Sequence, residues 1–396
     1  LILLQYKLYR DALTGAYNFN TDAFWKNFLR DLELGQLDNT EGYVCATVPQ
    51  TGPAGIGFIS MLGWGNAVTI LPEMMYRQFG DEEALPRQYE SMKLFVEAEI
   101  RKMGKKNLWI GPSLGDWLAM GKGIAWQAMH NNPVSNAFIV HDLKVISETA
   151  ERLGKREDAA RYRRQLAATT DAYIKKFVSK NGIVAKDYQS AYIMALKYVL
   201  PEGELRERVK KNFVANIRKN GLQTGFFATE HLLPLLVEAG EQKLAYDVLL
   251  QENCPGWMYQ VKCGATTTWE RWDALKPDGT VNEEKMAGSG ENMVSFNHYA
   301  FGSVGEFYYQ YILGIRPEKP GFAKLHFAPY PDERLGGVSG SYLSVAGKIE
   351  SAWRYEADGC HIRLATPVEA VVLLPDGRSE NVPAGTYEWT VKRPNL

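Results

Sequence analysis

The chain has 396 residues, a formal net charge of −1 and four cysteines. This length predicts one large domain, or a large domain with a small one. Because the charge is nearly balanced, without a basic run or an acidic tail, it argues against nucleic acid or an anionic membrane surface as partner. No apolar run is long enough to predict a membrane span.

The cysteines indicate the redox compartment, and the first residues indicate whether the sequence begins within a longer protein. Cys45, Cys254, Cys263 and Cys360 have neither metal-binding spacing nor the pattern of a disulfide framework, so we expect free thiols, which weakly favours a reducing compartment. The opening LILLQYKLYRDALTGAYNF lacks a starting methionine and a signal-peptide layout, and it looks like the middle of a helix. We expect the chain to begin partway through a larger protein.

Helical periodicity dominates up to about residue 313. Apolar residues recur at three- and four-residue steps with charged residues opposite. The pattern predicts helices at roughly 2–15, 21–36, 65–80, 83–104, 134–154, 156–178, 188–200, 202–219, 229–239, 241–251 and 298–313. Three long connections, 37–64, 105–133 and 252–297, separate some of them. Long structured loops in a compact domain usually carry function.

The order of the elements predicts the architecture. Eleven helices with alternating short and long connections indicate a barrel of helical hairpins, one helix short of the twelve in a six-hairpin toroid. From about Phe322 the pattern changes to period-two alternation with Gly or Pro-Asp-Gly turns, which is typical of an antiparallel β domain. We therefore predict an (α/α)6 barrel, incomplete at its N-terminus, over 1–316 and a small antiparallel β-sandwich over 317–396.

The sequence motifs favour a site that uses carboxylates in aromatic loops. Phosphate-loop, zinc-protease and serine-hydrolase motifs are missing from the sequence, and six histidines make a His-based site unattractive. Polar residues beside aromatic ones recur instead in GWGNA (63–67), GDWLAMG (115–121), TTTWERWDALKPDG (266–279) and SFNHYAFGSVGEF (295–307). Since each lies where a loop leads into a helix, we expect them to meet at one end of the toroid.

Each of these signals is weak alone. Trp64 and Trp117 suit core packing, His298 suits a capping or core histidine, and Asp116 suits a helix cap. Glu270 lies between Trp269 and Trp272, where a carboxylate is poorly solvated. Aromatic side chains are also what carbohydrate sites use to hold the apolar faces of a sugar.

Three segments then resemble a known family. TGFFATEHLLPLL, QENCPGWMYQVKCGATTTWERWDALKPDG and MVSFNHYAFGSVGEFYYQYILGIRP resemble the bacterial α-L-rhamnosidases of glycoside hydrolase family 78. The similarity extends in order from AYNFNTDAFWKNFLRDLELGQ, through LGWGNAVTILPEMMYRQFGD and GDWLAMG, to PGFAKLHFAPYP and GSYLSVAGKIESAW. It implies an (α/α)6 barrel with a C-terminal β-sandwich. It also implies hydrolysis of terminal α-L-rhamnose with inversion at the anomeric carbon, without a metal or organic cofactor.

The resemblance also assigns roles to residues. Glu270 matches the general base, His298 matches a histidine that hydrogen-bonds the rhamnose hydroxyls, and Trp64 and Trp117 match aromatic walls. Trp269 and Trp272 would shape and dry the surroundings of Glu270. The predicted substrate-binding residues are Trp64, Asn66, Asp116, Trp117, Trp269 and His298.

Two departures from the family pattern leave alternatives open. The family usually reads W-G-D-A where this chain has Asn66 in third place, and its general-acid motif, resembling D-C-P-x-R-[DE]-E-R-x-G-W, is missing from residues 1–16. The acid therefore lies outside this sequence or has been lost. The alternatives to a rhamnosidase are a non-hydrolytic rhamnose-binding relative and another toroid enzyme, such as a trehalase-like hydrolase or a polysaccharide lyase. The neutral, Trp-rich loops disfavour a lyase.

Overall fold

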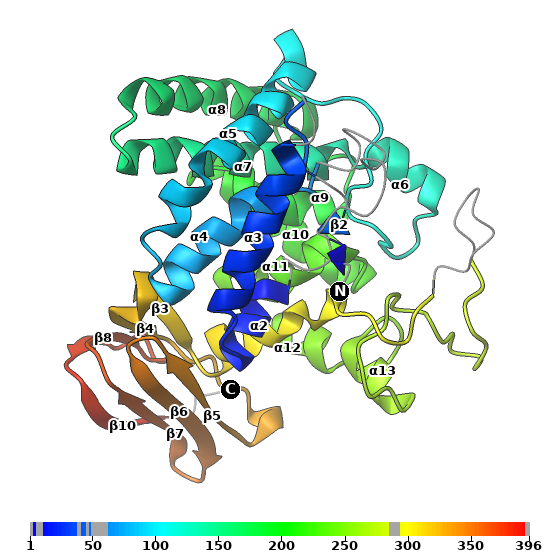
Figure 1. Ribbon diagram of the computed structural model, residues 1–396. Coiled ribbons are helices and arrows are strands. Elements are labelled where there is room, and N and C mark those ends of the chain that lie inside the picture. Colours follow the sequence, from blue (N-terminus) through cyan, green and yellow to red (C-terminus); the bar gives the residue numbers. More distant parts are fainter. Residues whose placement is uncertain are drawn as a thin grey trace. The chain divides into compact units, whose positions relative to one another are not determined.

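A computed structural model describes residues 3–4, 11–37, 41–44, 47–48, 62–284 and 294–392 (Figure 1). These residues form two compact units. One comprises Leu1–Asp11, Asn27–Leu71 and Pro86–Gly302, and the other comprises Ala12–Lys26, Pro72–Leu85 and Ser303–Leu396. The predicted boundary between residues 316 and 317 stays a prediction.

Most predicted helices are present with boundaries close to those expected. They are α3 (Asp22–Leu37), α4 (Ala67–Phe79), α5 (Ala84–Met103), α7 (Asn132–Arg152), α8 (Arg156–Phe177), α9 (Gln189–Met194, continued by a π turn over Ala195–Val199), α10 (Glu204–Asn220), α11 (Phe226–Glu238) and α12 (Gln242–Leu250). The last predicted helix is a 3-10 turn (Ala300–Val304), α14 (Gly305–Phe307) and a π turn (Tyr308–Ile312) in succession. None of the helices described has the length and apolarity needed to cross a bilayer.

The prediction of a helix over residues 2–15 is wrong in its first part. Leu3–Leu4 form a short strand, β1, paired antiparallel with β2 (Thr47–Val48), and α2 covers only Ala12–Asn18. A short apolar run suits a strand as well as a buried helix, so its composition alone could not decide. Two short helices, α6 (Ile124–His130) and α13 (Trp257–Lys262), lie inside connections that the sequence predicted as loops.

In the first unit the helices form hairpins with an inner and an outer member. Helix α7 packs on both α8 and α9, α9 packs on α10 and α11, and α11 packs on α12. Nearly every residue of α9 and α11 is buried, whereas α8 buries a single stripe of four residues. A helix buried on all sides must be apolar all round, and one covering it needs only one apolar face. The inner helices are therefore α7, α9 and α11.

The C-terminal strands form two four-stranded sheets. The strands are β3 (Ile315–Lys319), β4 (Lys324–Phe327), β5 (Gly337–Ser344), β6 (Gly347–Glu356), β7 (Gly359–Thr366), β8 (Ala370–Leu373), β9 (Ser379–Val382) and β10 (Gly385–Val391). The sheets have the orders β10-β7-β6-β5 and β3-β4-β8-β9. The predicted β domain is confirmed, with the difference that β4 and β8 pair in parallel. The connection from β4 to β8 passes through the other sheet, so it is long enough for a parallel pair.

Tyr342 of β5 joins this domain to helical segments of the same unit. Its hydroxyl accepts a hydrogen bond from Gln78 Nε2 of α4 at 2.8 Å, and its ring meets that of Tyr17 of α2 edge-on at 4.9 Å. Trp353 Nε1 donates to the carbonyl of Ile312 at 2.7 Å. Tyr342 and Trp353 thus both contact helical segments within this unit.

The Gln78–Tyr342 hydrogen bond generates a stability prediction. Gln78 is only 2% exposed, so Tyr342→Phe leaves a buried amide without this acceptor. We expect the free energy of unfolding, measured with urea, to fall by roughly 1–3 kcal/mol. Tyr387→Phe is the matched control, because that hydroxyl donates to Pro383 in an exposed position. Equal stabilities of the two variants would contradict the prediction.

Candidate active site

Glu270 and His298, far apart in the sequence, are held together by a short backbone ladder. The Glu270 amide donates to the Ser295 carbonyl at 2.8 Å, and the His298 amide donates to the Thr268 carbonyl at 2.8 Å. The Thr268 hydroxyl donates in return to the His298 carbonyl at 2.7 Å. As a result His298 Nε2 lies 3.9 Å from Glu270 Oε1, and both residues are 7% exposed.

The two tryptophans beside Glu270 anchor its segment in different places. The Trp269 ring packs edge-on against Tyr259 and Phe296, at 6.3 and 5.2 Å between centroids. Trp272 stacks on Phe301 at 3.9 Å, and its Nε1 donates to the Thr224 carbonyl at 2.9 Å. Both indoles are buried. They fix the backbone on each side of Glu270, and the predicted contact of Trp269 with sugar stays a prediction.

The rings of Trp64 and Trp117 are in contact, and their predicted role as aromatic walls around the sugar stays a prediction. Their rings are perpendicular at 6.2 Å, and Trp64 also meets the Phe227 ring at 5.4 Å. Trp64 Nε1 donates to the Gly115 carbonyl at 3.2 Å, which ties the GWGNA turn to the GDWLAMG loop. Gly63 has φ of +82°, and a Cβ there would lie 2.7 Å from the Phe227 ring, so the turn requires glycine.

Asn66 is completely buried and uses both ends of its amide within the protein. Its Oδ1 accepts from the Gly63 amide at 2.7 Å, and its Nδ2 donates to Asp142 Oδ2. Asp142 Oδ1 also accepts from the Thr69 hydroxyl. Burial and the neighbouring Asp142 raise the pKa of Glu99 well above its usual range. An aspartate at position 66 would add a third acid here, whereas the asparagine donates a hydrogen bond. Asn66 thus shapes the Trp64 turn, and its predicted sugar contact stays untested.

Asp116 is buried and caps a helix that is distant in sequence. Its Oδ2 accepts from the Gly225 amide at 2.8 Å, and its Oδ1 accepts from the amides of Phe227 and Ala228. These are N–H groups that the first turn of α11 leaves without partners inside the helix. Burial raises the pKa of Asp116, and the backbone hydrogen bonds oppose this. Asp116 therefore caps α11, a helix remote in sequence, and its predicted sugar contact stays a prediction.

The start of α11 connects the two groups of candidate residues. The Phe226 ring stacks on the His298 ring at 5.1 Å, while Phe227 packs against Trp64. Phe226 and Phe227 were not predicted as site residues, although two adjacent phenylalanines after a glycine at a helix start are a usable signal. Asp142 and Glu99 were also missed. Each is an acid at a buried helix position, which is a second kind of signal.

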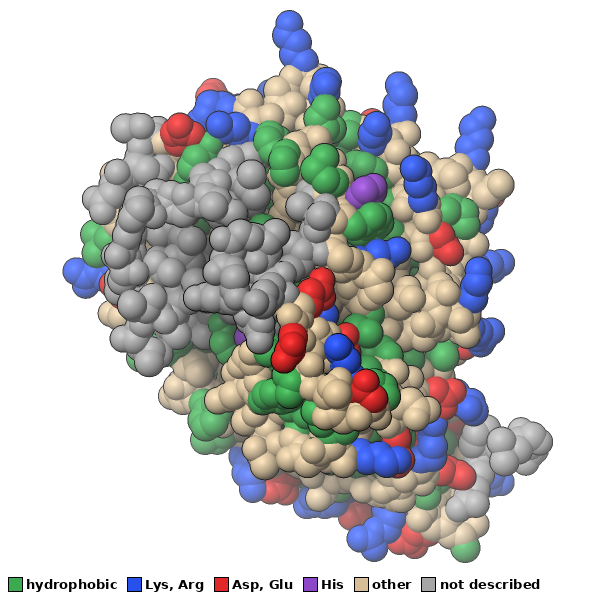
Figure 2. Space-filling model, turned by 90° about the vertical axis from the view of Figure 1, so that its right-hand side faces the viewer, with side chains coloured by type: hydrophobic (Ala, Val, Ile, Leu, Met, Phe, Trp, Pro, Cys, Tyr) green, Lys and Arg blue, Asp and Glu red, His purple; other side chains and the backbone are tan. Residues whose placement is uncertain are grey.

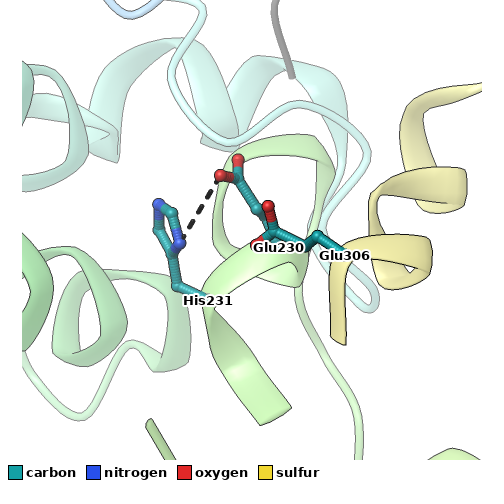
Figure 3. A group of neighbouring side chains, drawn as sticks. All are labelled: Glu230, His231 and Glu306. Atoms are coloured by element: carbon teal, nitrogen blue, oxygen red, sulfur yellow. Dashed lines mark ion pairs between the residues drawn. The ribbon is translucent and has the colours of Figure 1, made fainter. Parts of the chain in front are cut away.

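Further along α11 is another pair of ionisable side chains. His231 Nδ1 lies 3.8 Å from a Glu230 carboxylate oxygen (Figure 3), and His231 Nε2 lies 3.0 Å from the Tyr198 hydroxyl. The Tyr198 ring contacts the His141 ring at 4.6 Å, and His141 Nδ1 lies 3.5 Å from Asp142. These contacts connect α7, the π turn after α9 and α11 through polar side chains. We assign these side chains no contact with substrate.

One cluster in the β domain has the composition of a metal site. Glu356, Asp358 and His361 offer ligand atoms within 4.8 Å of one another. All three are on the surface, and His361 Nε2 already pairs with Asp358 at 2.7 Å. Exposed acids of this kind are ordinary surface ion pairs, and we assign no metal to them.

Comparison with known proteins identifies the family of the chain. The family of the bacterial alpha-L-rhamnosidase 6 hairpin glycosidase domain matches residues 8–312, and that of the bacterial alpha-L-rhamnosidase C-terminal domain matches residues 314–387. An alpha-L-rhamnosidase of Alteromonas sp. (strain LOR) is 33% identical over 360 residues, which are 89% of this chain and 38% of that protein. One of Formosa agariphila is 31% identical over 390 residues, 95% of this chain and 40% of the relative.

Solved structures show the same likeness. The crystal structure of Streptomyces avermitilis alpha-L-rhamnosidase complexed with L-rhamnose has a TM-score of 0.88 and 29% identity, over 98% of this chain and 38% of that one. Native α-L-rhamnosidase from Aspergillus terreus has a TM-score of 0.89 and 28% identity, over 98% and 45%. The chain spans less than half the length of each of these relatives. It belongs to the bacterial α-L-rhamnosidase family of six-hairpin glycosidases, as the two family matches over residues 8–312 and 314–387 show.

Proposed function

We propose that this chain carries the base and the sugar-binding walls of an inverting α-L-rhamnosidase, which releases terminal rhamnose from glycosides or polysaccharides. The observation that carries the proposal is the Glu270–His298 pair, whose side chains lie 3.9 Å apart. Both residues are buried beside aromatic rings, and the start of α11 connects His298 to Trp64 and, through Trp64, to Trp117. The named function of the relatives, and the rhamnose in one related structure, support the choice of sugar.

The proposed mechanism assigns one task to each group. Glu270, as a carboxylate, takes a proton from the water that attacks the anomeric carbon. His298 binds a rhamnose hydroxyl and holds the ring in front of Glu270. Trp64 and Trp117 exclude bulk water and pack against the apolar side of the sugar, including its C6 methyl group. A low-dielectric setting strengthens each of these electrostatic contacts.

The reaction also needs a general acid on the opposite side of the sugar. In inverting glycosidases the two carboxyl groups stand about 6.5–9.5 Å apart, so that a water fits between the base and the sugar. We expect the acid to come from the family motif that residues 1–16 lack. The second candidate function is rhamnose binding without hydrolysis, because the Glu270–His298 pair and the contact between Trp64 and Trp117 could equally hold a sugar that is not cleaved.

The first prediction concerns the base. In a protein that combines this chain with a general acid, Glu270→Gln should abolish turnover but keep rhamnose binding, since Gln preserves shape and removes only the charge. Calorimetry of L-rhamnose binding and an activity assay on the same preparation measure both. Glu283→Gln is a control, because Glu283 is an exposed acid of the following loop. If Glu270→Gln keeps normal turnover, Glu270 is not the base.

The second prediction concerns the leaving group. The 396-residue chain should be nearly inert on natural rhamnosides, because loss of a general acid typically costs ~10²–10⁴-fold in rate. p-Nitrophenyl rhamnoside should suffer much less, since p-nitrophenolate leaves without a proton. Release of rhamnose from both substrates is the measurement. Full activity on a natural disaccharide would place an acid within this chain, and activity on neither substrate, with rhamnose bound, would favour the binding protein.

A further inference from the structure

A positively charged hollow lies in the first unit between α6, the end of α8 and the segment before α9. Its volume is about 830 Å³. Lys122, Lys175, Lys176 and Lys186 line it, and Asp187 is its single lining carboxylate. Asp187 already accepts a hydrogen bond from the Tyr192 hydroxyl at 2.9 Å. Within the described part of the chain, no ion pair is formed by any of these lysines.

One wall of this hollow is aromatic. The Trp126 ring stacks on that of His130 at 4.4 Å and meets the Tyr188 ring edge-on at 5.2 Å. Lys122 Nζ lies 4.6 Å from the centroid of Trp126. Small-molecule sites are commonly lined by aromatic side chains with a few polar groups, as this hollow is.

A second, smaller hollow connects this region to the candidate site. It has a volume of about 300 Å³, and its lining includes Leu118, Lys122, Gln127 and Arg271. Lys122 lines both hollows. Leu118 follows Trp117 in the chain and Arg271 follows Glu270. The smaller hollow is therefore built by the next residues of the two loops that carry the aromatic wall and the proposed base.

Two side chains that line the smaller hollow have a buried polar atom for which the described residues provide no hydrogen-bond partner. Arg271 pairs through Nε with Asp273 at 3.0 Å and through Nη2 with Glu284 at 2.7 Å. Its Nη1, and Oε1 of Gln127, are buried and have no hydrogen-bond partner among the described residues. Gln127 is 1% exposed and Arg271 9%. A donor and an acceptor beside one hollow match a sugar hydroxyl, which can serve both.

The backbone at the rim of the larger hollow is strained. Ala185, Lys186 and Asp187 are consecutive and have φ of 44°, 59° and 69°. Residues with a Cβ avoid this region, and such strain is found where surrounding contacts impose it. Here the Ala185 amide donates to Phe177 and the Asp187 amide to Val184. The turn positions Lys186 on the hollow.

We infer that the two hollows form one track that binds an anionic oligosaccharide, namely the part of the substrate that leaves when rhamnose is released. The inference rests on the proposed function and names its substrate class. Four lysines face one carboxylate in the larger hollow, and Lys122, Arg271 and Lys276 face Asp273 and Glu284 in the smaller one, which gives a local positive excess in a chain whose net charge is −1. Figure 2 faces the side on which α6 lies in Figure 1, and in its upper part Lys and Arg side chains lie above and to the right of hydrophobic ones. An anion, either a carboxylate or a sulfate ester, is attracted to such a surface.

A purely structural role for the lysines provides the matched control. Lys175 and Lys176 lie in the last turn of α8, where cations interact well with the helix dipole. Lys105 and Lys106 are exposed too and follow the end of α5. If the lysines matter only as helix-end charges, both pairs should behave alike.

The test compares Lys175→Gln/Lys176→Gln with Lys105→Gln/Lys106→Gln, each combined with Glu270→Gln so that ligands stay intact. The ligands are three rhamnose-ended trisaccharides whose last unit is glucose, glucuronate or glucose sulfate, together with free L-rhamnose. A glucosyl-glucuronate and a glucosyl-glucose without rhamnose complete the set. Calorimetry is done at ionic strengths of ~0.02 M and ~0.5 M, because screening by salt weakens surface electrostatics.

We expect the anionic trisaccharides to bind about tenfold more tightly than the neutral one at low salt. The preference should shrink severalfold in the Lys175/Lys176 variant and at high salt, and persist in the Lys105/Lys106 variant. A preference for glucuronate alone identifies a carboxylate ligand, and one for the sulfate alone identifies a sulfate ester. Equal binding of neutral and anionic ligands, or equal effects of both lysine pairs, overturns the inference.

The rhamnose-free ligands separate this inference from the proposed function. In one outcome L-rhamnose does not bind, but glucosyl-glucuronate binds more tightly than glucosyl-glucose and needs Lys175 and Lys176. The anionic track is then supported and the proposed function is contradicted. In the other outcome L-rhamnose binds, but ligands with anionic units bind no more tightly than neutral ones. The proposed function is then supported and the anionic track is contradicted.

Discussion

The cap that Asp116 places on α11 is the constraint on which the rest of the candidate site depends. Its carboxylate accepts backbone N–H groups from Gly225, Phe227 and Ala228, more than one hundred residues further along the chain. A charged acceptor in a buried position makes strong hydrogen bonds and is costly to disturb. The position of the first turn of α11 is therefore set by the GDWLAMG loop.

That turn carries two adjacent rings in different directions. Phe227 packs against Trp64, and Phe226 stacks on His298. Adjacent helical residues point about 100° apart, so one turn can support two walls of a site. The loop that contributes Trp117 therefore also fixes the supports of Trp64 and His298. The Asp116 carboxylate therefore connects the GDWLAMG loop, the GWGNA turn and the segment that carries His298 through the start of α11.

The tryptophans around Glu270 also make sense as supports. Trp269 and Trp272 pack in different aromatic groups. Backbone hydrogen bonds join the segment that carries Glu270 to the segment that carries His298. A catalytic carboxylate is effective only when its position is held closely, and rigid neighbours supply that. The indoles hold the backbone, and the carboxylate is the group that we propose to react.

The sequence predicted the fold well where periodicity was strong. Helices α7, α8 and α10 and the β strands after Phe322 follow from apolar spacing alone, and the family resemblance identified Glu270 and His298. Helices α6 and α13 were missed, because six or seven residues give too few turns for a periodic signal. The Asp116 cap and the Asp142–Asn66 contact join distant segments, so no local pattern could reveal their partners.

The most direct test of this account is L-rhamnose binding by an Asp116→Asn variant. The amide keeps the size of the carboxylate but removes its charge and one acceptor, so we expect the free energy of unfolding to fall by roughly 2–3 kcal/mol. Calorimetry on the folded variant should show rhamnose affinity at least about tenfold weaker, a loss of ~1.4 kcal/mol. Asp158→Asn removes a partly exposed partner of Tyr89 and Lys93, so it should lower stability and leave rhamnose binding intact. Unchanged rhamnose affinity in Asp116→Asn would show that the start of α11 does not hold the site together.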